Sequence, residues 1–61
     1  MDVTEKIINH LKEIDRTLGW LAKMTEYNYN TLYSALVKKS MKLTDERLQK
    51  INWILGTKFK R

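Results

Sequence analysis

Apolar side chains recur along the first fifteen residues at the spacing of one helical face. These positions are Val3, Ile7, Leu11 and Ile14. Their intervals of four, four and three residues match the 3.6-residue period of an amphipathic α-helix. Asp2 precedes the run and belongs to a residue type that accepts hydrogen bonds from the free amides of a first helical turn. The pattern therefore predicts a helix over about residues 3–15.

Two shorter helices are predicted next, over about residues 18–25 and 28–37. Thr17 and Asn28 stand where these helices would begin, and both residue types cap helix N-termini. The residues expected to share the inner side are Leu18, Leu21, Ala22, Thr25, Leu32, Ala35 and Leu36. The outer side of the third helix carries Asn30, Tyr33, Ser34 and Val37, with Tyr29 exposed at its first turn.

A fourth helix is predicted over about residues 45–55, followed by a basic tail over residues 57–61. Thr44 is its expected cap, and Gly56 suits the left-handed conformation that ends many helices. Two acidic residues follow the cap, and the helix dipole favours negative charge there. The apolar face consists of Leu48, Ile51 and Leu55. No alternating strand pattern occurs, so we expect a compact all-α fold of four to five helices.

The composition narrows the class of protein. The chain has 61 residues, no Cys and no Pro, and 43% of its residues are hydrophobic. Disulfide bonds and thiolate metal sites are therefore excluded, and the hydrophobic fraction is too high for a disordered segment. A chain of this length forms at most one domain, so we expect a single domain over residues 1–61 with a small core.

Charge is distributed unevenly along the chain, whose formal net charge is +5. Residues 1–30 carry four basic and five acidic side chains, whereas residues 31–61 carry eight basic and two acidic ones. This asymmetry indicates a polyanionic partner on one side of the molecule. The alternative is a solvated basic surface without a partner.

The sequence also bears on location. The N-terminal residues are acidic and lack the apolar run of a signal peptide. No segment approaches the roughly 18 apolar residues that a membrane-spanning helix needs. We therefore expect a soluble, cytoplasmic protein without a membrane partner.

The segment from Leu18 to Leu36 has the layout of a helix-turn-helix, in which two short helices are joined by about three residues. Such helices cross at a steep angle, which requires a small residue at the crossing, and Ala22 supplies it. Tyr27 follows the turn and can fill the corner between the helices. Leu32 lies one turn into the second helix, where an aliphatic side chain must face back toward the first.

The residues from Leu21 to Leu36 resemble the helix-turn-helix of phage Cro and repressor proteins, the XRE-type family. The run from Leu48 to Leu55 is similar to the helix that follows in that family, and the resemblance covers roughly residues 4–56. It implies a lambda-repressor-like domain that binds double-stranded DNA sequence-specifically. The function implied is a transcriptional regulator, a small Cro-like repressor that acts as a homodimer on a pseudo-palindromic operator.

Two positions depart from the family's pattern. Glu26 occupies the turn position at which the family usually has Gly. A left-handed conformation at this position costs a residue with a Cβ atom about 1 kcal/mol. Leu18 occupies the position at which a Gln often contacts a DNA phosphate, and Thr17 is the side chain that could replace that contact.

The resemblance also implies which residues meet DNA. Tyr29, Asn30 and Ser34 take the positions that read bases, with Asn28 and Tyr33 beside them. An Asn carboxamide can bond adenine N6 and N7, and a Tyr ring can touch a thymine methyl group. The residues expected at DNA phosphates are Thr17, Lys23, Lys38, Lys39 and Lys42, and the tail residues Lys58, Lys60 and Arg61 are further candidates. The alternatives are a polar turn with an Asn cap and a set of solvated lysines.

Trp53 lies on the polar side of the predicted fourth helix. A large aromatic side chain in that position favours a contact surface. We expect Trp53, with Ile54 and Phe59, to form a homodimer seam. The alternative is that the tail folds back and Phe59 covers Trp53 within one chain.

Residues for catalysis are not apparent. His10 is the only His, so a two-His metal site cannot form within one chain, and no Gly-rich phosphate loop occurs. We therefore expect no enzyme, no cofactor and no small-molecule effector. Two other functions remain open. One is a phage-like protein-interaction module, an inhibitor or antirepressor, to which the tyrosines would contribute. The other is an antitoxin that binds both DNA and a protein.

Overall fold

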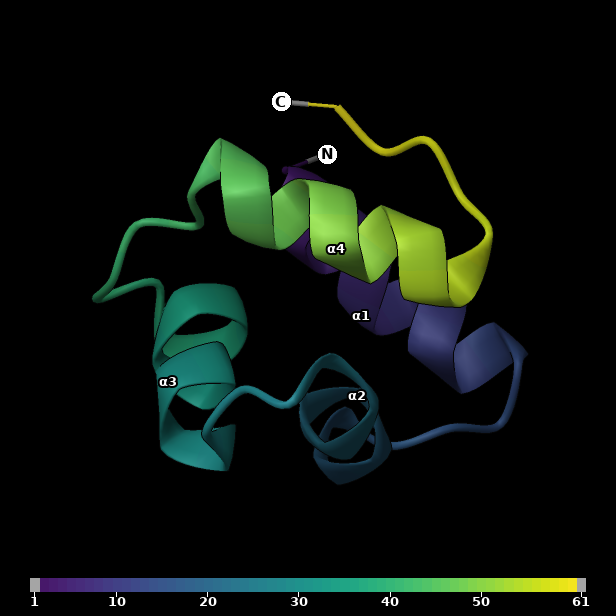
Figure 1. Cartoon of the computed structure of the whole chain (residues 1–61), viewed down its shortest axis with the longest axis horizontal. Coiled ribbons are helices and arrows are strands. Elements are labelled where there is room, and N and C mark those ends of the chain that lie inside the picture. The colour runs from purple at the N-terminus through teal and green to yellow at the C-terminus, as the bar shows by residue number, and fades with distance from the viewer. Residues whose placement is uncertain (1, 61) are drawn as a thin grey trace.

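The computed structural model describes residues 2–60 and contains four α-helices over that range (Figure 1). They are α1 (Val3–Glu13), α2 (Leu18–Thr25), α3 (Tyr29–Tyr33) and α4 (Asp45–Leu55). The third continues as a π-helical segment, η1 (Ser34–Lys38). No strand occurs among these residues, so the predicted all-α fold class is confirmed. Arg61, the end of the expected basic tail, lies outside the described residues.

Two helix boundaries differ from the prediction. The first helix ends at Glu13 rather than near residue 15 because Asp15 adopts a left-handed conformation, with φ 58°. The third helix changes from α to π geometry at Ser34 and ends at Lys38, one residue later than expected. The carbonyl of Ser34 accepts the N–H groups of Lys39 and Ser40, which closes this wide last turn.

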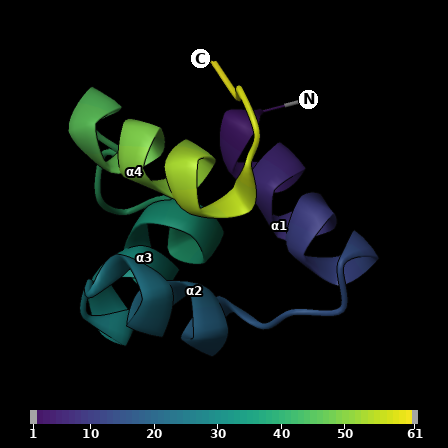
Figure 2. The ribbon, with the colours of Figure 1, turned by 45° about the vertical axis from the view of Figure 1, so that its right-hand side comes forward.

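The four helices form two groups by position rather than by packing, because α1 and α4 make few contacts with each other. In Figures 1 and 2, α1 and α4 lie with both ends of the chain at one side of the molecule, and α2 and α3 lie at the other. Contacts between the groups run from α2 to α4 and from α1 to η1. The Cα atoms span 25 × 23 × 18 Å. The tail after α4 turns back beside α4 and does not reach α2 or α3.

The core forms where the apolar faces of the helices meet. Its fully buried apolar side chains are Ile7, Leu21, Leu32, Leu36 and Ile51, and each lies on a face predicted to be apolar. Ile14 differs, because it follows the last residue of α1 and is 40% exposed. Leu43 was not predicted in the core but is buried there. It precedes the N-cap of α4, and its spacing to Leu48 is that of a hydrophobic staple.

All four predicted N-caps are confirmed. Asp2 Oδ1 accepts the N–H of Thr4 at 3.2 Å, and Thr17 Oγ1 accepts that of Trp20 at 3.1 Å. Asn28 and Thr44 cap α3 and α4 in the same way, at 2.8 and 3.3 Å. Gly56, with φ 68°, is the C-cap of α4, as predicted.

No helix within residues 2–60 is both long enough and apolar enough to cross a bilayer.

Candidate nucleic-acid interface

Helices α2 and α3 pack against each other. Ala22 and Leu32 are both buried in the core. Glu26 adopts the left-handed conformation, with φ 62° and ψ 22°, although it carries a Cβ atom. The N–H of Tyr27 then donates to the carbonyl of Ala22 at 3.1 Å. Thr25, which is fully buried, donates its hydroxyl to the carbonyl of Leu21 at 2.8 Å and so satisfies its only side-chain polar atom.

The predicted base-reading residues share the outer face of α3 and η1. Asn30 is exposed, Tyr29 is 49% exposed and Ser34 is half-buried. The ring centroids of Tyr29 and Tyr33 lie 6.0 Å apart, with an angle of 32° between the ring planes. The Lys38 ammonium lies 5.8 Å from the centroid of the Tyr33 ring, within range of a cation–π contact. These side chains therefore form one accessible surface of polar, aromatic and basic character.

The start of α2 borders this surface. A shallow hollow of about 270 Å³ brings Thr17, Arg16 and Lys12 beside Tyr29 and Tyr33. Lys12 and Arg16 were not among the predicted DNA contacts. Arg16 could have been identified from the sequence, because it directly precedes the N-cap of α2. Lys12 could not, because its place beside this surface depends on where α1 ends. The two cations extend the basic edge of the surface.

The backbone at the start of α2 is accessible. Leu18, at the position where the resembled family often has a Gln, packs against the core and offers no polar group. Gly19 is exposed, and a Cβ atom added there would meet only the Thr17 hydroxyl, at 3.8 Å. A phosphate could therefore approach the first amides of this eight-residue helix, whose dipole favours an anion. The Arg16 guanidinium lies 5.2 Å from the centroid of the Trp20 ring, which holds it near the same helix end.

The lysines predicted at phosphates have different environments. Lys23 on α2 and Lys42 in the loop before α4 are exposed. Lys39 instead forms ion pairs with Asp2 and Glu5, both at 3.3 Å. Its ammonium therefore links the end of η1 to the start of α1, a role that sequence reasoning missed.

These contacts shift two pKa values. The pKa of Asp2 lies below its ordinary value of 3.8, chiefly because the backbone N–H of Thr4 donates to the carboxylate and also because Lys39 does. The pKa of Lys39 lies above its ordinary value of 10.5, chiefly because its ammonium donates a hydrogen bond to Asp2 and also because it donates one to Glu5. Asp2 and Lys39 are therefore both charged through the neutral pH range.

Tyr27 joins the turn to α4. The Arg47 guanidinium and the Lys50 ammonium lie 5.8 and 5.2 Å from the centroid of its ring. Two cations on one half-buried ring fix the turn against the first half of α4. This cluster could not be predicted from local patterns, because Tyr27 is about twenty residues away from Arg47 and Lys50.

The residues of the expected dimer seam do not share one surface. Trp53 is 79% exposed, whereas Ile54 packs against the core. The ring of Phe59 packs edge-on against His10 of α1, with centroids 5.8 Å apart. Phe59 therefore neither covers Trp53, as the alternative held, nor joins it in an outward patch.

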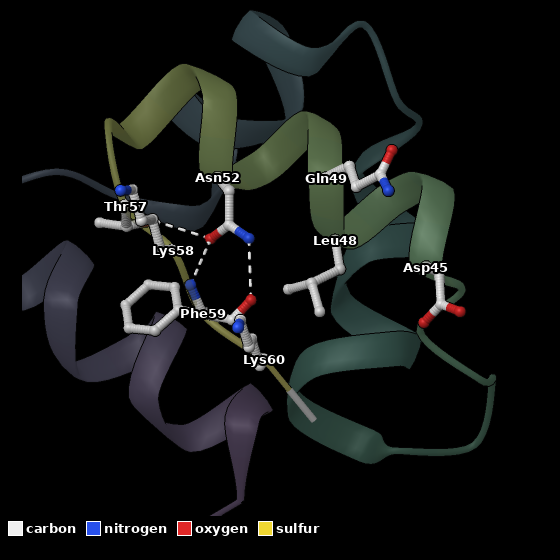
Figure 3. A pocket seen from close by; sticks show the side chains of 8 residues that line it. All are labelled: Asp45, Leu48, Gln49, Asn52, Thr57, Lys58, Phe59 and Lys60. Carbon is white, nitrogen blue, oxygen red and sulfur yellow. Dashed lines mark hydrogen bonds between the residues drawn. The ribbon is translucent and has the colours of Figure 1, made fainter.

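A single Asn holds the tail in this position. In Figure 3, Asn52 of α4 points toward the tail, and its amide pairs with the backbone of Phe59. Its Oδ1 accepts the Phe59 N–H and the Thr57 hydroxyl, and its Nδ2 donates to the Phe59 carbonyl, each at 2.9 Å. An open hollow of about 650 Å³ lies between α4 and this tail, with Leu48 and Phe59 at its base.

Among residues 2–60, no group of three or more His, Asp or Glu side chains is placed to hold a metal ion. Comparisons with protein-family models, curated protein sequences and solved structures found no match for this chain.

Proposed function

We propose that this chain is a sequence-specific DNA-binding regulator of the lambda-repressor-like type, a small Cro-like repressor that acts as a homodimer. The observation that carries the proposal is the exposed outer face of α3 and η1, with Asn30 in its first turn and Arg16 and Thr17 at its border. The tail lies on the other side of the molecule and leaves this face open (Figure 2).

The dimensions and chemistry of this face suit the major groove of DNA. An α-helix with side chains is about 10–12 Å across, and the groove is about 12 Å wide. With α3 in the groove, Asn30 can make two hydrogen bonds to adenine, worth about 1–3 kcal/mol of discrimination. Thr17, Arg16 and the amide of Gly19 would then meet the phosphates of one strand. These backbone contacts supply affinity and register rather than sequence information.

A homodimer would place two such faces on one operator. Half-sites one helical turn apart have centres about 34 Å apart. The longest span of the Cα atoms is 25 Å, and side chains add to it, so two adjacent copies are of a size that allows this spacing. Trp53 is the exposed apolar side chain of α4 that we assign to the contact between copies. Occupation of such a site blocks access to an overlapping promoter.

Selection of duplexes from a random pool, followed by gel shifts with competitor DNA, tests the proposal. The parent chain should enrich a pseudo-palindromic site, and the double variant Asn30→Ala with Ser34→Ala should lose preference for it. Glu13→Gln, an exposed change at the end of α1 beside the tail, serves as the matched control and should bind as the parent does. Binding that ignores sequence entirely would contradict a regulator.

The second candidate is a protein-interaction module with the same fold, an inhibitor or antirepressor. It is favoured by the exposed aromatic side chains Trp53 and Tyr29, because Tyr and Trp are enriched in protein interfaces. The same double variant separates the two functions. Loss of a protein partner without any effect on DNA binding would favour this module.

A further inference from the structure

The outer face of α3 and η1 carries two parallel rows of side chains. Tyr29, Tyr33 and Val37 follow one another at intervals of four residues, and Asn30 and Ser34 form a second row beside them. Residues four apart lie one above the other on a helix, so each row runs along the axis. The first row is aromatic and aliphatic, and the second is polar.

None of the three side chains of the apolar row belongs to the core, although Tyr33 is half-buried. Tyr29 is 49% exposed and Val37 is 45% exposed. The rings of Tyr29 and Tyr33 lie 6.0 Å apart, and all three side chains line one hollow with Ile8 of α1. Exposed apolar side chains that line up on one helix mark a contact surface, because water solvates them poorly.

An A·T pair presents both kinds of group in the major groove. Adenine offers N7 and the N6 amino group, and its thymine partner offers a C5 methyl group, which no other base has. The polar row suits the adenine edge, and the apolar row suits the methyl. We propose, on the basis of the proposed function, that Tyr29, Tyr33 and Val37 select half-sites of adjacent A·T pairs by contact with the thymine methyl groups.

Replacement of thymine by deoxyuridine tests this directly, because deoxyuridine pairs with adenine and lacks only the methyl. Duplexes enriched by the parent chain from a random pool are made in both forms, and their affinities are compared by titration. The enriched half-site should contain adjacent A·T pairs. Each contacted methyl should be worth about fourfold in affinity, the factor expected for burial of one such group.

Variants assign the effect to the apolar row. Tyr29→Ala and Val37→Ala should each lower the ratio of thymine to deoxyuridine affinity toward one. Asn30→Ala is the matched control from the polar row, and it should weaken both duplexes equally and leave the ratio unchanged. All three positions are exposed, and circular dichroism melts verify that each variant is folded.

The outcomes separate this inference from the proposed function. An enriched site that binds equally well with deoxyuridine, or one without A·T pairs, overturns methyl selection while sequence-specific binding stands. A chain that enriches no site overturns both.

Discussion

Left-handed residues end the helices of this protein, and only one of them is Gly. Asp15, Glu26 and Lys39 have φ between 58° and 62°, and Gly56 has φ 68°. A left-handed conformation costs a residue with a Cβ atom roughly 1–2 kcal/mol. The buried contacts of α2 and α3 on either side of Glu26 hold it in place despite this cost.

Glu26→Gly should raise the free energy of unfolding by about 1 kcal/mol, because Gly has no Cβ atom to clash in this conformation. For a domain of this size, that corresponds to a melting temperature about 4–8 °C higher. Thermal unfolding followed by circular dichroism measures the change. Lys23→Gly, within α2, is the matched control and should lower stability by about 1 kcal/mol. Equal shifts for both variants would mean that Glu26 is unstrained.

Asn52→Ala should lower the free energy of unfolding by about 1–2 kcal/mol, because it removes three hydrogen bonds to a partly exposed tail. The Phe59 amide should also exchange its hydrogen faster. Asn52→Asp retains the oxygen that accepts from Phe59 and Thr57 but loses the donor, so its effect should be intermediate. Unchanged exchange at Phe59 in the Ala variant would show that ring packing alone holds the tail.

At the scale of elements, one cation links two helices that are far apart in the sequence. Lys39 at the end of η1 pairs with Asp2 and Glu5 at the start of α1. All three side chains are substantially exposed to solvent, so the link is sensitive to salt.

Stability should therefore depend on pH at both extremes. Asp2 has a lowered pKa, so its contribution is present above 3.8 and is lost as the pH falls through its folded value. Lys39 has a raised pKa, so its contribution is present below 10.5 and is lost as the pH rises through its folded value. Melting temperatures of the parent and Asp2→Asn should differ near pH 7 and converge below pH 3.8. Asn also caps helices, so this variant removes the charge and keeps a cap. A difference in melting temperature that persists in acid would therefore be assigned to unequal capping by Asp and Asn.

At the scale of the molecule, basic residues lie in two places. Lys12, Arg16 and Lys38 lie beside the outer face of α3, and Lys58 and Lys60 belong to the tail, which Figure 1 shows across the molecule from α3. Only the first group can reach a duplex bound at that face. We therefore expect the lysines beside the α3 face to contribute to the salt dependence of DNA binding and the lysines of the tail not to.

The logarithm of affinity should fall with the logarithm of salt concentration at a slope near −7, if a dimer neutralises about eight phosphates. Lys38→Ala should make this slope shallower by about 2, since it removes one contact from each copy. Lys58→Ala, on the tail, should leave the slope unchanged. Equal changes for both variants in a salt titration would mean that binding is not confined to the α3 face.

Trp53→Ala should shift the chain from dimer to monomer in sedimentation equilibrium, because it removes the most exposed apolar side chain of α4. The Trp53 side chain makes little contact with the core, so its loss should leave the melting temperature of the monomer unchanged. A mass that matches the parent at every concentration would rule out a seam at Trp53.

Local sequence patterns were enough to predict the helices, their N-caps and most of the core. Apolar periodicity and capping act between residues at most four positions apart, so Asp2, Thr17, Asn28 and Thr44 could be assigned without a fold. The outer face of α3 was predicted for the same reason.

The contacts between distant side chains could be identified only in the folded chain, because folding determines which of them meet. It paired Lys39 with the start of α1, set Arg16 beside Tyr29, and turned Phe59 toward His10 and away from Trp53. Such contacts depend on how the helices cross and where each connection leads. That geometry follows from the packing of the whole core, which no local pattern of residues encodes.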